Sequence, residues 1–334
     1  MSRPVAVVTG AAGFIGSHMV DLLRARDYTV RGIDNLASGR RENLAQWASD
    51  PQVSLDERDV RTIAPTDPVF RGARALVHFA GLGDIVPSID RPTDYLSTNV
   101  MGTVAALEGA RQARVAKFVY AASSSCYGLA TEVPTTENVP IAPQYPYALS
   151  KYLGEQAVLH WGQVYRLPVV SIRIFNAYGP RVRTTGAYGA VFGVFLAQKL
   201  AGKPLTVVGD GTQRRDFVFV TDVARAFLLA AESPRAQTIY NLGAGNPQSI
   251  NRLVELIGGD VVHMPKRPGE PQCTWANISK IRAELGWEPD VPFEEGVTIM
   301  LRQIEQWRGA PVWDQASIQA ATQGWFATLS GAAQ

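Results

Sequence analysis

The sequence predicts an α/β fold with a doubly wound parallel sheet and a smaller mixed α/β lobe near the carboxyl terminus. Three observations predict it: short apolar runs alternate with helical patterns in the first half, glycines follow the first apolar run, and the alternation loosens after about residue 178. Strands that alternate with helices form parallel sheets with helices on both faces. Ligands of such sheets bind beyond the carboxyl ends of the strands, so a site is expected at that edge.

The expected elements of the first half are strands at 5–10, 29–34, 53–59, 75–81, 117–123 and 168–176, and helices at 14–26, 93–113 and 147–163. Later, "GAVFGVFLAQKLAG" and "DVARAFLLAAE" have helical spacing, whereas "PLTVVGDG" and "TIYNLGAG" contain strand patterns. We expect residues 1–178 to form the first domain, with 213–245 returning to it. The lobe that binds the substrate would then consist of 179–212 and 246–334.

Composition excludes several classes of protein. The 334 residues are 46% hydrophobic and 19% charged, which is typical of a globular chain, and a net charge of +2 with scattered Lys and Arg argues against binding to nucleic acid or membranes. Two cysteines and four histidines lack the spacing of metal ligands, so no metal is expected. The chain shows no signal-peptide pattern and no apolar run of about 18 residues, so we expect a cytoplasmic protein.

The glycines in "VVTGAAGFIGS" indicate a phosphate-binding turn. Gly10, Gly13 and Gly16 lie between a predicted strand and a predicted helix, where they permit a pyrophosphate to approach the helix N-terminus. Asp34 ends the next strand and can accept hydrogen bonds from a ribose diol, although a turn or a capping role would explain it too. An acid there repels a 2′-phosphate and favours NAD, while the nearby Arg40 and Arg41 leave NADP as the alternative.

"YPYALSKYLGE" places Tyr147 and Lys151 four residues apart, on one face of a predicted helix. A lysine ammonium near a phenol favours the phenolate and lowers a pKa that is ordinarily about 10. Tyr147 is therefore a candidate general base for a sugar hydroxyl.

Further motifs accompany these: "HFAG", "SSSCYG", "RIFNAYGPR", "VVGDGTQRRDFVFVTDVA", "YNLGAG", "RPGE" and "ISKIRAELGWEP". Together with the glycine loop and "YALSK", they resemble the extended short-chain dehydrogenase/reductase family, specifically its NAD-dependent nucleotide-sugar epimerases and dehydratases, and most of all UDP-hexose 4-epimerases. The resemblance covers the chain to about residue 305 and implies a Rossmann fold. Residues 306–334 extend past it, and we expect a packed tail helix there.

The resemblance implies an NAD site. The glycine loop would bind the pyrophosphate, Asp34 the adenosine ribose, Asp59 and Val60 the adenine, and Lys151 the nicotinamide ribose. The implied cofactor-binding residues are Gly10, Gly13, Phe14, Ile15, Gly16, Asp34, Asn35, Ser38, Gly39, Asp59, Val60, Phe79, Ala80, Gly81, Asn99, Tyr147 and Lys151.

The implied reaction is epimerisation of a UDP-sugar at C4 through a transient 4-keto sugar. Tyr147 would take the 4-hydroxyl proton as a hydride leaves C4 for NAD, and Ser123 would hydrogen-bond the 4-oxygen. Dehydratases of the family carry acids at the next two positions, where this chain has Ser124 and Ser125. Serines cannot replace those acids, so the resemblance favours epimerisation over dehydration or decarboxylation.

The implied substrate-binding residues are Ser88, Ser124, Ser125, Asn176, Arg183, Arg215, Arg267, Glu270 and Thr274. Arginines suit a diphosphate and Glu270 would take the uridine ribose, although a surface or inter-lobe salt bridge competes as an explanation for each. A small Thr274 would leave room for a C2 acetamido group. Arg183 would meet a C6 carboxylate or cap the interface between lobes, with equal support for both.

The sugar therefore stays open between UDP-glucose/galactose and UDP-GlcNAc/GalNAc types. The alternatives are a UDP-glucuronate 4-epimerase, another 4-keto enzyme such as a dehydratase or an NADPH-dependent reductase, and a non-catalytic protein that binds NAD(P). The resemblance also implies a homodimer that associates through the helices near 93–113 and 147–163.

Overall fold

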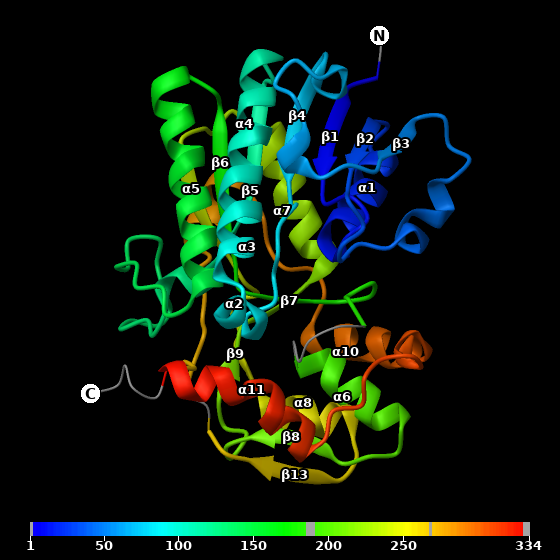
Figure 1. Ribbon diagram of the computed structural model, residues 1–334, viewed down its shortest axis with the longest axis vertical. Coiled ribbons are helices and arrows are strands. Elements are labelled where there is room, and N and C mark those ends of the chain that lie inside the picture. Colours follow the sequence, from blue (N-terminus) through cyan, green and yellow to red (C-terminus); the bar gives the residue numbers. More distant parts are fainter. Residues whose placement is uncertain (1–2, 185–190, 267–268, 330–334) are drawn as a thin grey trace.

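The computed structural model describes residues 3–184, 191–266 and 269–329. Its upper part is a seven-stranded sheet in which every pairing is parallel and the strand order is β3-β2-β1-β4-β5-β6-β11 (Figure 1). The strands are β1 (Val5–Thr9), β2 (Thr29–Ile33), β3 (Val53–Asp56), β4 (Ala73–His78), β5 (Lys117–Ser123), β6 (Val169–Ile174) and β11 (Thr238–Leu242). The predicted doubly wound parallel sheet is confirmed.

Helices cover both faces of this sheet, which explains why β6, "VVSIRI", is buried along its whole length. On one face, α1 (Phe14–Ala25) packs against α7 (Val220–Glu232). On the other, α4 (Gly102–Gln112) packs against α5 (Pro146–Tyr165), and these two stand side by side in Figure 1. Each layer has its own apolar cluster against the sheet.

The helical stretch expected over 93–113 is confirmed. After α2 (Val86–Asp90), the structure has an unbroken helical run of α3 (Pro92–Leu96), a π-helical turn over Ser97–Met101, and α4; the π turn itself was not expected. A π turn contains one extra residue and often occurs at functional sites. Here it carries Asn99, whose buried side chain bonds the backbone of Leu82 in both directions, at 2.7 and 3.0 Å.

The lower part of the molecule in Figure 1 is built on a second apolar core, which includes Phe195, Leu253, Met300 and Trp307. Its elements are α6 (Val191–Leu200), β8 (Leu205–Val208), α8 (Ile250–Ile257), β13 (Val261–Met264), α10 (Phe293–Arg302) and α11 (Gln315–Leu329). The pair β7 (Asn176–Tyr178) and β10 (Phe217–Phe219) is parallel, and the pair β9 (Arg214–Arg215) and β12 (Gln248–Ser249) is antiparallel. Helix α9 (Ser279–Leu285) packs against β11. The exact boundaries of the two lobes stay a prediction.

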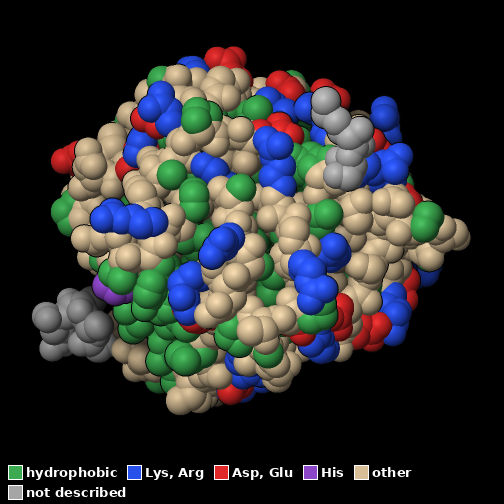
Figure 2. All heavy atoms as spheres, turned by 90° about the horizontal axis from the view of Figure 1, so that it is seen from above, with side chains coloured by type: hydrophobic (Ala, Val, Ile, Leu, Met, Phe, Trp, Pro, Cys, Tyr) green, Lys and Arg blue, Asp and Glu red, His purple; other side chains and the backbone are tan. Residues whose placement is uncertain are grey.

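Short 3-10 turns complete the chain, at Arg41–Trp47, Val60–Thr62, Pro68–Phe70, Ser124–Tyr127 and Ile304–Trp307. Across 3–184, 191–266 and 269–329, none of the helices is long and apolar enough to cross a membrane. The cytoplasmic location stays a prediction. Seen from above, Lys and Arg side chains are spread over the surface rather than gathered in one patch (Figure 2).

A buried ion pair joins α5 to the sheet. The Arg173 guanidinium on β6 donates to the Glu155 carboxylate on α5 at 2.6 Å, and the two side chains are 3% and 1% exposed. Arg173 also donates to the Tyr127 hydroxyl at 2.7 Å, and Tyr127 in turn donates to Asn241 on β11 at 2.7 Å. The network therefore ties the turn after β5 and two strands to one helix.

Removing one partner of this pair is expected to destabilise the protein strongly, because the other charge would stay buried without compensation. We expect Glu155→Leu to lower the free energy of unfolding by about 3–5 kcal/mol. The double variant Glu155→Leu/Arg173→Met should recover part of that loss, since it removes both buried charges. Urea unfolding followed by circular dichroism measures both variants. A double variant less stable than Glu155→Leu would contradict this account.

Candidate active site

The turn between β1 and α1 requires glycine. Gly10 has a positive φ of +68°, and its carbonyl accepts the N–H of Gly13 at 3.0 Å. A Cβ on Gly16 would lie 2.0 Å from the Gly10 carbonyl oxygen, so helix and turn approach too closely for any side chain there. Phe14 and Ile15 open α1, whose N-terminus has no side-chain cap and no acid in its first turn. This positively polarised end is suited to a phosphate.

Asp34 lies directly after β2 and is 7% exposed. Its carboxylate accepts N–H bonds from Ala12 at 3.0 Å and from Leu36 at 2.8 Å, so it also holds the glycine turn in place. Burial raises the pKa of Asp34, and the backbone donors oppose that shift. Because a carboxylate offers about four acceptor sites, it can still accept bonds from a ribose.

The neighbouring predicted residues follow β2 and β3. Gly39 packs against the Asp34 carboxylate: a Cβ there would lie 2.8 Å from both oxygens. Ser38 is exposed, while Asn35 donates to Asp59 at 3.2 Å. Hydrogen bonds from Arg61 lower the pKa of Asp59 to about 2, and Val60 is buried behind it.

The end of β4 brings three more predicted residues to the same edge. The hydroxyl of Thr9 on β1 accepts the N–H of Ala80 at 3.2 Å, and Phe79 packs on Phe227 with ring centroids 4.6 Å apart. Gly81 is pressed against Asn99, since a Cβ there would lie 2.8 Å from the side-chain oxygen Oδ1 of Asn99. Asn99 also donates to Ser150 on α5 at 2.8 Å, which links this turn to the helix of Tyr147.

Tyr147, in the first turn of α5, meets the turn after β5. The Ser123 hydroxyl lies 2.8 Å from the Ser125 hydroxyl, and the turn that follows Ser123 packs against α5. Burial raises the pKa of Tyr147, and a polar interaction with Ser123 opposes that shift. We expected Lys151 to lower the pKa of Tyr147, but in the structure burial raises it and outweighs the polar contacts.

Lys151 is buried beneath the same edge. Its ammonium lies 4.6 Å from the centroid of the Tyr120 ring, and a Cβ on Gly81 would lie 4.0 Å from it. Burial lowers the pKa of Lys151 to about 8, and the Glu155 carboxylate opposes the shift.

An aromatic cluster around Tyr147 was missed by the sequence analysis. The Tyr145 ring lies nearly parallel to the Tyr147 ring, at 7° with centroids 6.4 Å apart, and Tyr95 meets Tyr147 edge-on at the same distance. Trp325 on α11 is 4% exposed and lies 5.4 Å from the Tyr145 ring. The sequence signal was present in "YPYALSK", where Tyr145 stands two residues before Tyr147.

The structure brings four predicted substrate residues into one group. Arg215 and Glu270 lie 3.9 Å apart, and Thr274 donates to Asn176 at 2.7 Å. The Thr274 hydroxyl also accepts the Asp216 N–H at 3.2 Å, so Thr274 joins the segments of Asn176 and Asp216. The charges of Glu270 and Arg215 also affect the pKa of Tyr145: the carboxylate raises it and the guanidinium lowers it, while burial is the main cause of its rise.

The other residues expected to bind the substrate lie outside the group of Asn176, Arg215, Glu270 and Thr274, or outside the described residues. Ser88 is fully buried in α2 and donates to the Ile85 carbonyl, whereas Ser124 is partly buried in the turn with Ser123 and Ser125. Arg183 forms an ion pair with Asp84 at 2.8 Å. Arg267 lies outside the described residues.

The arrangement fits NAD. The uncapped α1 N-terminus and the Asp34 carboxylate follow adjacent strands, and Gly10 and Gly16 let the turn and the helix approach closely. Among residues 3–184, 191–266 and 269–329, His, Cys, Asp and Glu form no group of three that could hold a metal ion.

Comparisons with known proteins agree with this geometry. A family model described as "NAD dependent epimerase/dehydratase family" matches residues 6–243. The UDP-glucose 4-epimerase of Mycolicibacterium smegmatis is 35% identical over 304 residues, which cover 87% of this chain and 95% of that protein.

Solved structures are similar over nearly their whole length. The UDP-glucose 4-epimerase of Thermotoga maritima with UDP-glucose has a TM-score of 0.84 at 31% identity, covering 90% of this chain and 99% of that one. The UDP-glucuronic acid 4-epimerase of Bacillus cereus, in complex with UDP-glucuronic acid and NAD, has a TM-score of 0.84 at 28% identity, with the same coverage. The chain therefore belongs to the NAD dependent epimerase/dehydratase family, as an NAD-dependent nucleotide-sugar enzyme.

Proposed function

We propose that this chain interconverts the C4 epimers of a UDP-hexose, of the UDP-glucose/galactose or the UDP-GlcNAc/GalNAc type. The observation that carries the proposal is the turn after β5, which packs against the helix of Tyr147: the Ser123 hydroxyl lies 2.8 Å from that of Ser125, and positions 124 and 125 bear hydroxyls rather than acids. Loss of water across C5–C6 needs an acid and a base beyond the group at the 4-oxygen. Epimerisation at C4 needs only that one group.

Each residue has a role in this proposal. Tyr147 accepts the proton of the 4-hydroxyl and later returns it, and Ser123 holds the 4-oxygen beside it. Lys151 keeps a positive charge beneath the site, with a pKa of about 8. NAD, when bound, accepts the hydride from C4 and returns it. Arg215 and Glu270 lie together where a nucleotide diphosphate and its ribose would bind.

The uronate alternative is disfavoured by the partner of Arg183. A C6 carboxylate would need this guanidinium, which already pairs with Asp84 at 2.8 Å. A second carboxylate at that position would repel Asp84. A neutral hexose avoids this repulsion, and we therefore favour it over UDP-glucuronate.

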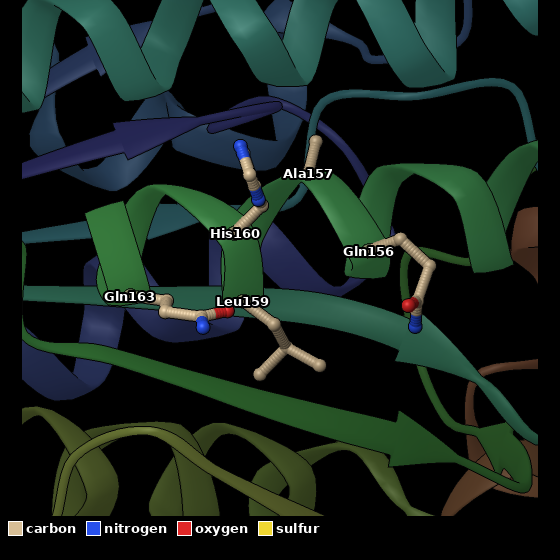
Figure 3. Close-up of a pocket in the computed structure, with 5 residues that line it drawn as sticks. All are labelled: Gln156, Ala157, Leu159, His160 and Gln163. Carbon is tan, nitrogen blue, oxygen red and sulfur yellow. The ribbon is translucent and has the colours of Figure 1, made fainter. Parts of the chain in front are cut away.

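We also propose a homodimer that associates through α5 and the neighbouring π turn. Leu149, Leu153 and Val164 are 40%, 37% and 50% exposed on α5, and Met101 is 58% exposed on the π turn. Farther along the same helix, an open depression of about 430 Å³ is lined by Gln156, Ala157, Leu159, His160 and Gln163 (Figure 3). Exposed apolar side chains interspersed with polar ones suit a symmetric interface with a second copy.

The epimerase proposal predicts a specific product. The protein, with NAD added, is incubated separately with UDP-glucose, UDP-GlcNAc and UDP-glucuronate, and the products are followed by NMR. We expect one of the two neutral hexoses to equilibrate with its C4 epimer. A 4-keto-6-deoxy product, turnover of UDP-glucuronate alone, or no turnover of any of the three would contradict the proposal.

Tyr147→Phe should lower kcat by about 10²–10⁴-fold, because the variant lacks the group that accepts the proton. NAD binding should persist, since the cofactor is held mainly by the glycine turn and Asp34. Kinetics with the substrate identified above and NAD titration by fluorescence measure the two properties. Undiminished kcat would remove Tyr147 from the mechanism.

Leu153→Glu should convert a dimer to a monomer, because it places a charge in the centre of the proposed apolar interface. Val261→Glu serves as a matched control, since Val261 is 40% exposed on β13 in the other part of the molecule. Size-exclusion chromatography with light scattering measures the mass of each. A monomeric parent, or a dimeric Leu153→Glu variant, would contradict the proposal.

A further inference from the structure

The tail helix α11 has one buried stripe. Ile318, Thr322 and Trp325 are 2%, 2% and 4% exposed, and their spacing of four and three residues places them on one side of the helix. Gln319 and Gln323, on other sides, are exposed. The stripe therefore faces the rest of the molecule.

The first half of α11 is anchored in the lower part of the molecule. Ile318 belongs to the second apolar core. Just before the helix, the Trp313 carbonyl accepts the Gln198 amide of α6 at 2.7 Å, and Gln315 donates to the His263 carbonyl of β13 at 3.3 Å. These contacts fix the start of α11 on α6 and β13.

The second half of α11 contacts the upper part. It packs against α2, below which it lies in Figure 1, and α2 in turn packs against α3 and α5. A Cβ on Gly324 would lie 3.0 Å from Oδ1 of Asp90 at the end of α2. The Trp325 ring lies 5.4 Å from the ring of Tyr145, the residue before α5, at an angle of 44°. One helix thus connects the two parts.

Both ends of this contact region adjoin the proposed substrate residues. The Tyr145 ring is parallel to that of Tyr147, with centroids 6.4 Å apart. In the last turn of α11, Leu329 Cδ1 would lie 3.5 Å from a Cβ on Gly269. The next residue, Glu270, lies 3.9 Å from Arg215. The end of α11 therefore contacts the neighbours of the proposed base and of the proposed nucleotide-binding residues.

A nucleotide sugar has to reach both groups at once. Tyr147 is on α5 in the upper part, whereas Arg215 is on β9 in the lower part. A ligand that spans two parts binds when they have the right relative position, and its apparent Kd rises as the fraction of molecules in that position falls. A helix packed on both parts increases that fraction.

We propose that α11 holds the two parts of the molecule together around the substrate site, and that Trp325, through Tyr145, is a positioning residue for the UDP-sugar. This inference rests on the proposed function, because that function supplies the substrate that spans the two parts. Trp325 acts through Tyr145 and takes no part in the transfer of protons or hydride.

The direct test is the binding of UDP to the NAD-loaded protein, measured by isothermal titration calorimetry. We expect Trp325→Ala to raise the Kd by about threefold to tenfold, the factor that corresponds to the energy of one aromatic pair. Trp325→Phe keeps a ring against Tyr145 and should stay near the parent value. Phe326→Ala is the matched control, because Phe326 is the next residue of α11 and is only partly buried. An unchanged Kd in Trp325→Ala, or an equal rise in Phe326→Ala, would overturn the inference.

A double variant tests whether Trp325 acts through Tyr145. Tyr145→Ala removes the other ring of the pair and should also weaken UDP binding. Tyr145→Ala/Trp325→Ala should bind UDP no more weakly than the weaker of the two single variants, since both remove the same contact. Losses of binding energy that add in full would overturn the inference.

Kinetics separate positioning from a general structural defect. With the hexose identified above, Trp325→Ala should raise KM while kcat stays near the parent value, because saturating substrate restores the bound arrangement. A structural defect lowers the fraction of folded enzyme and so lowers kcat without changing KM, and that result would overturn the inference. If the parent binds UDP but epimerises no hexose, the proposed function fails and the UDP series still decides the role of Trp325. A parent that does not bind UDP would refute both.

Hydrogen exchange on the unmodified chain needs no variant. In the NAD-loaded protein, UDP should slow exchange of the amides within 315–329, because binding favours the arrangement in which α11 is packed on both parts. Slower exchange around Arg215 with unchanged exchange in α11 would overturn the inference.

Discussion

The position of α5, the helix that carries Tyr147 and Lys151, depends on the buried pair of Glu155 and Arg173. Glu155 lies one turn after Lys151 and two turns after Tyr147 on α5, so the pair fixes the depth and rotation of the helix against β6. The same carboxylate raises the pKa of Lys151 against the effect of burial, which favours the charged form. Through Tyr127, Arg173 also reaches the turn that carries Ser123. One carboxylate thus aligns both sides of the proposed catalytic contact.

A second constraint, the hydrogen bonds of Asp216, holds in place the residues expected to bind the substrate, such as Asn176, Arg215 and Thr274. The Asp216 carboxylate accepts backbone N–H bonds from Ala244, Gly245 and Ala276 at 2.8, 3.0 and 2.9 Å. Its own backbone bonds Asn176 and Thr274. Arg215 is its neighbour in the chain, so the guanidinium starts from a backbone that is tied at several points. These bonds hold together three segments that are far apart in the sequence, around residues 176, 216 and 274, and a fourth at 244–245.

The sequence was sufficient to predict those parts of the candidate site that are formed by residues close together in the chain. The glycine turn and Asp34 could be predicted because a strand, a tight turn and a helix N-terminus constrain adjacent residues. The π turn at Asn99 could not, since it depends on a bond to the backbone of Leu82 from another segment. The contact of Trp325 with Tyr145 depends on how the tail helix packs, which periodicity does not encode. The pKa of Tyr147 was expected to fall because of one neighbour, Lys151. In the structure, burial has the larger effect and raises it.

The charged groups around Tyr147 bear on whether the chain is better suited to epimerisation or to dehydration. Asp84 is a carboxylate close enough to raise the pKa of Tyr147 and so to oppose the phenolate. Its pairing with Arg183 offsets that charge, which gives Arg183 a role without any carboxylate on the substrate. Acids at positions 124 and 125 would add the same repulsion directly beside Ser123. Serines there keep the turn neutral and leave hydroxyl donors near the proposed base, Tyr147, which suits the proposed reaction, in which protons move only at the 4-oxygen.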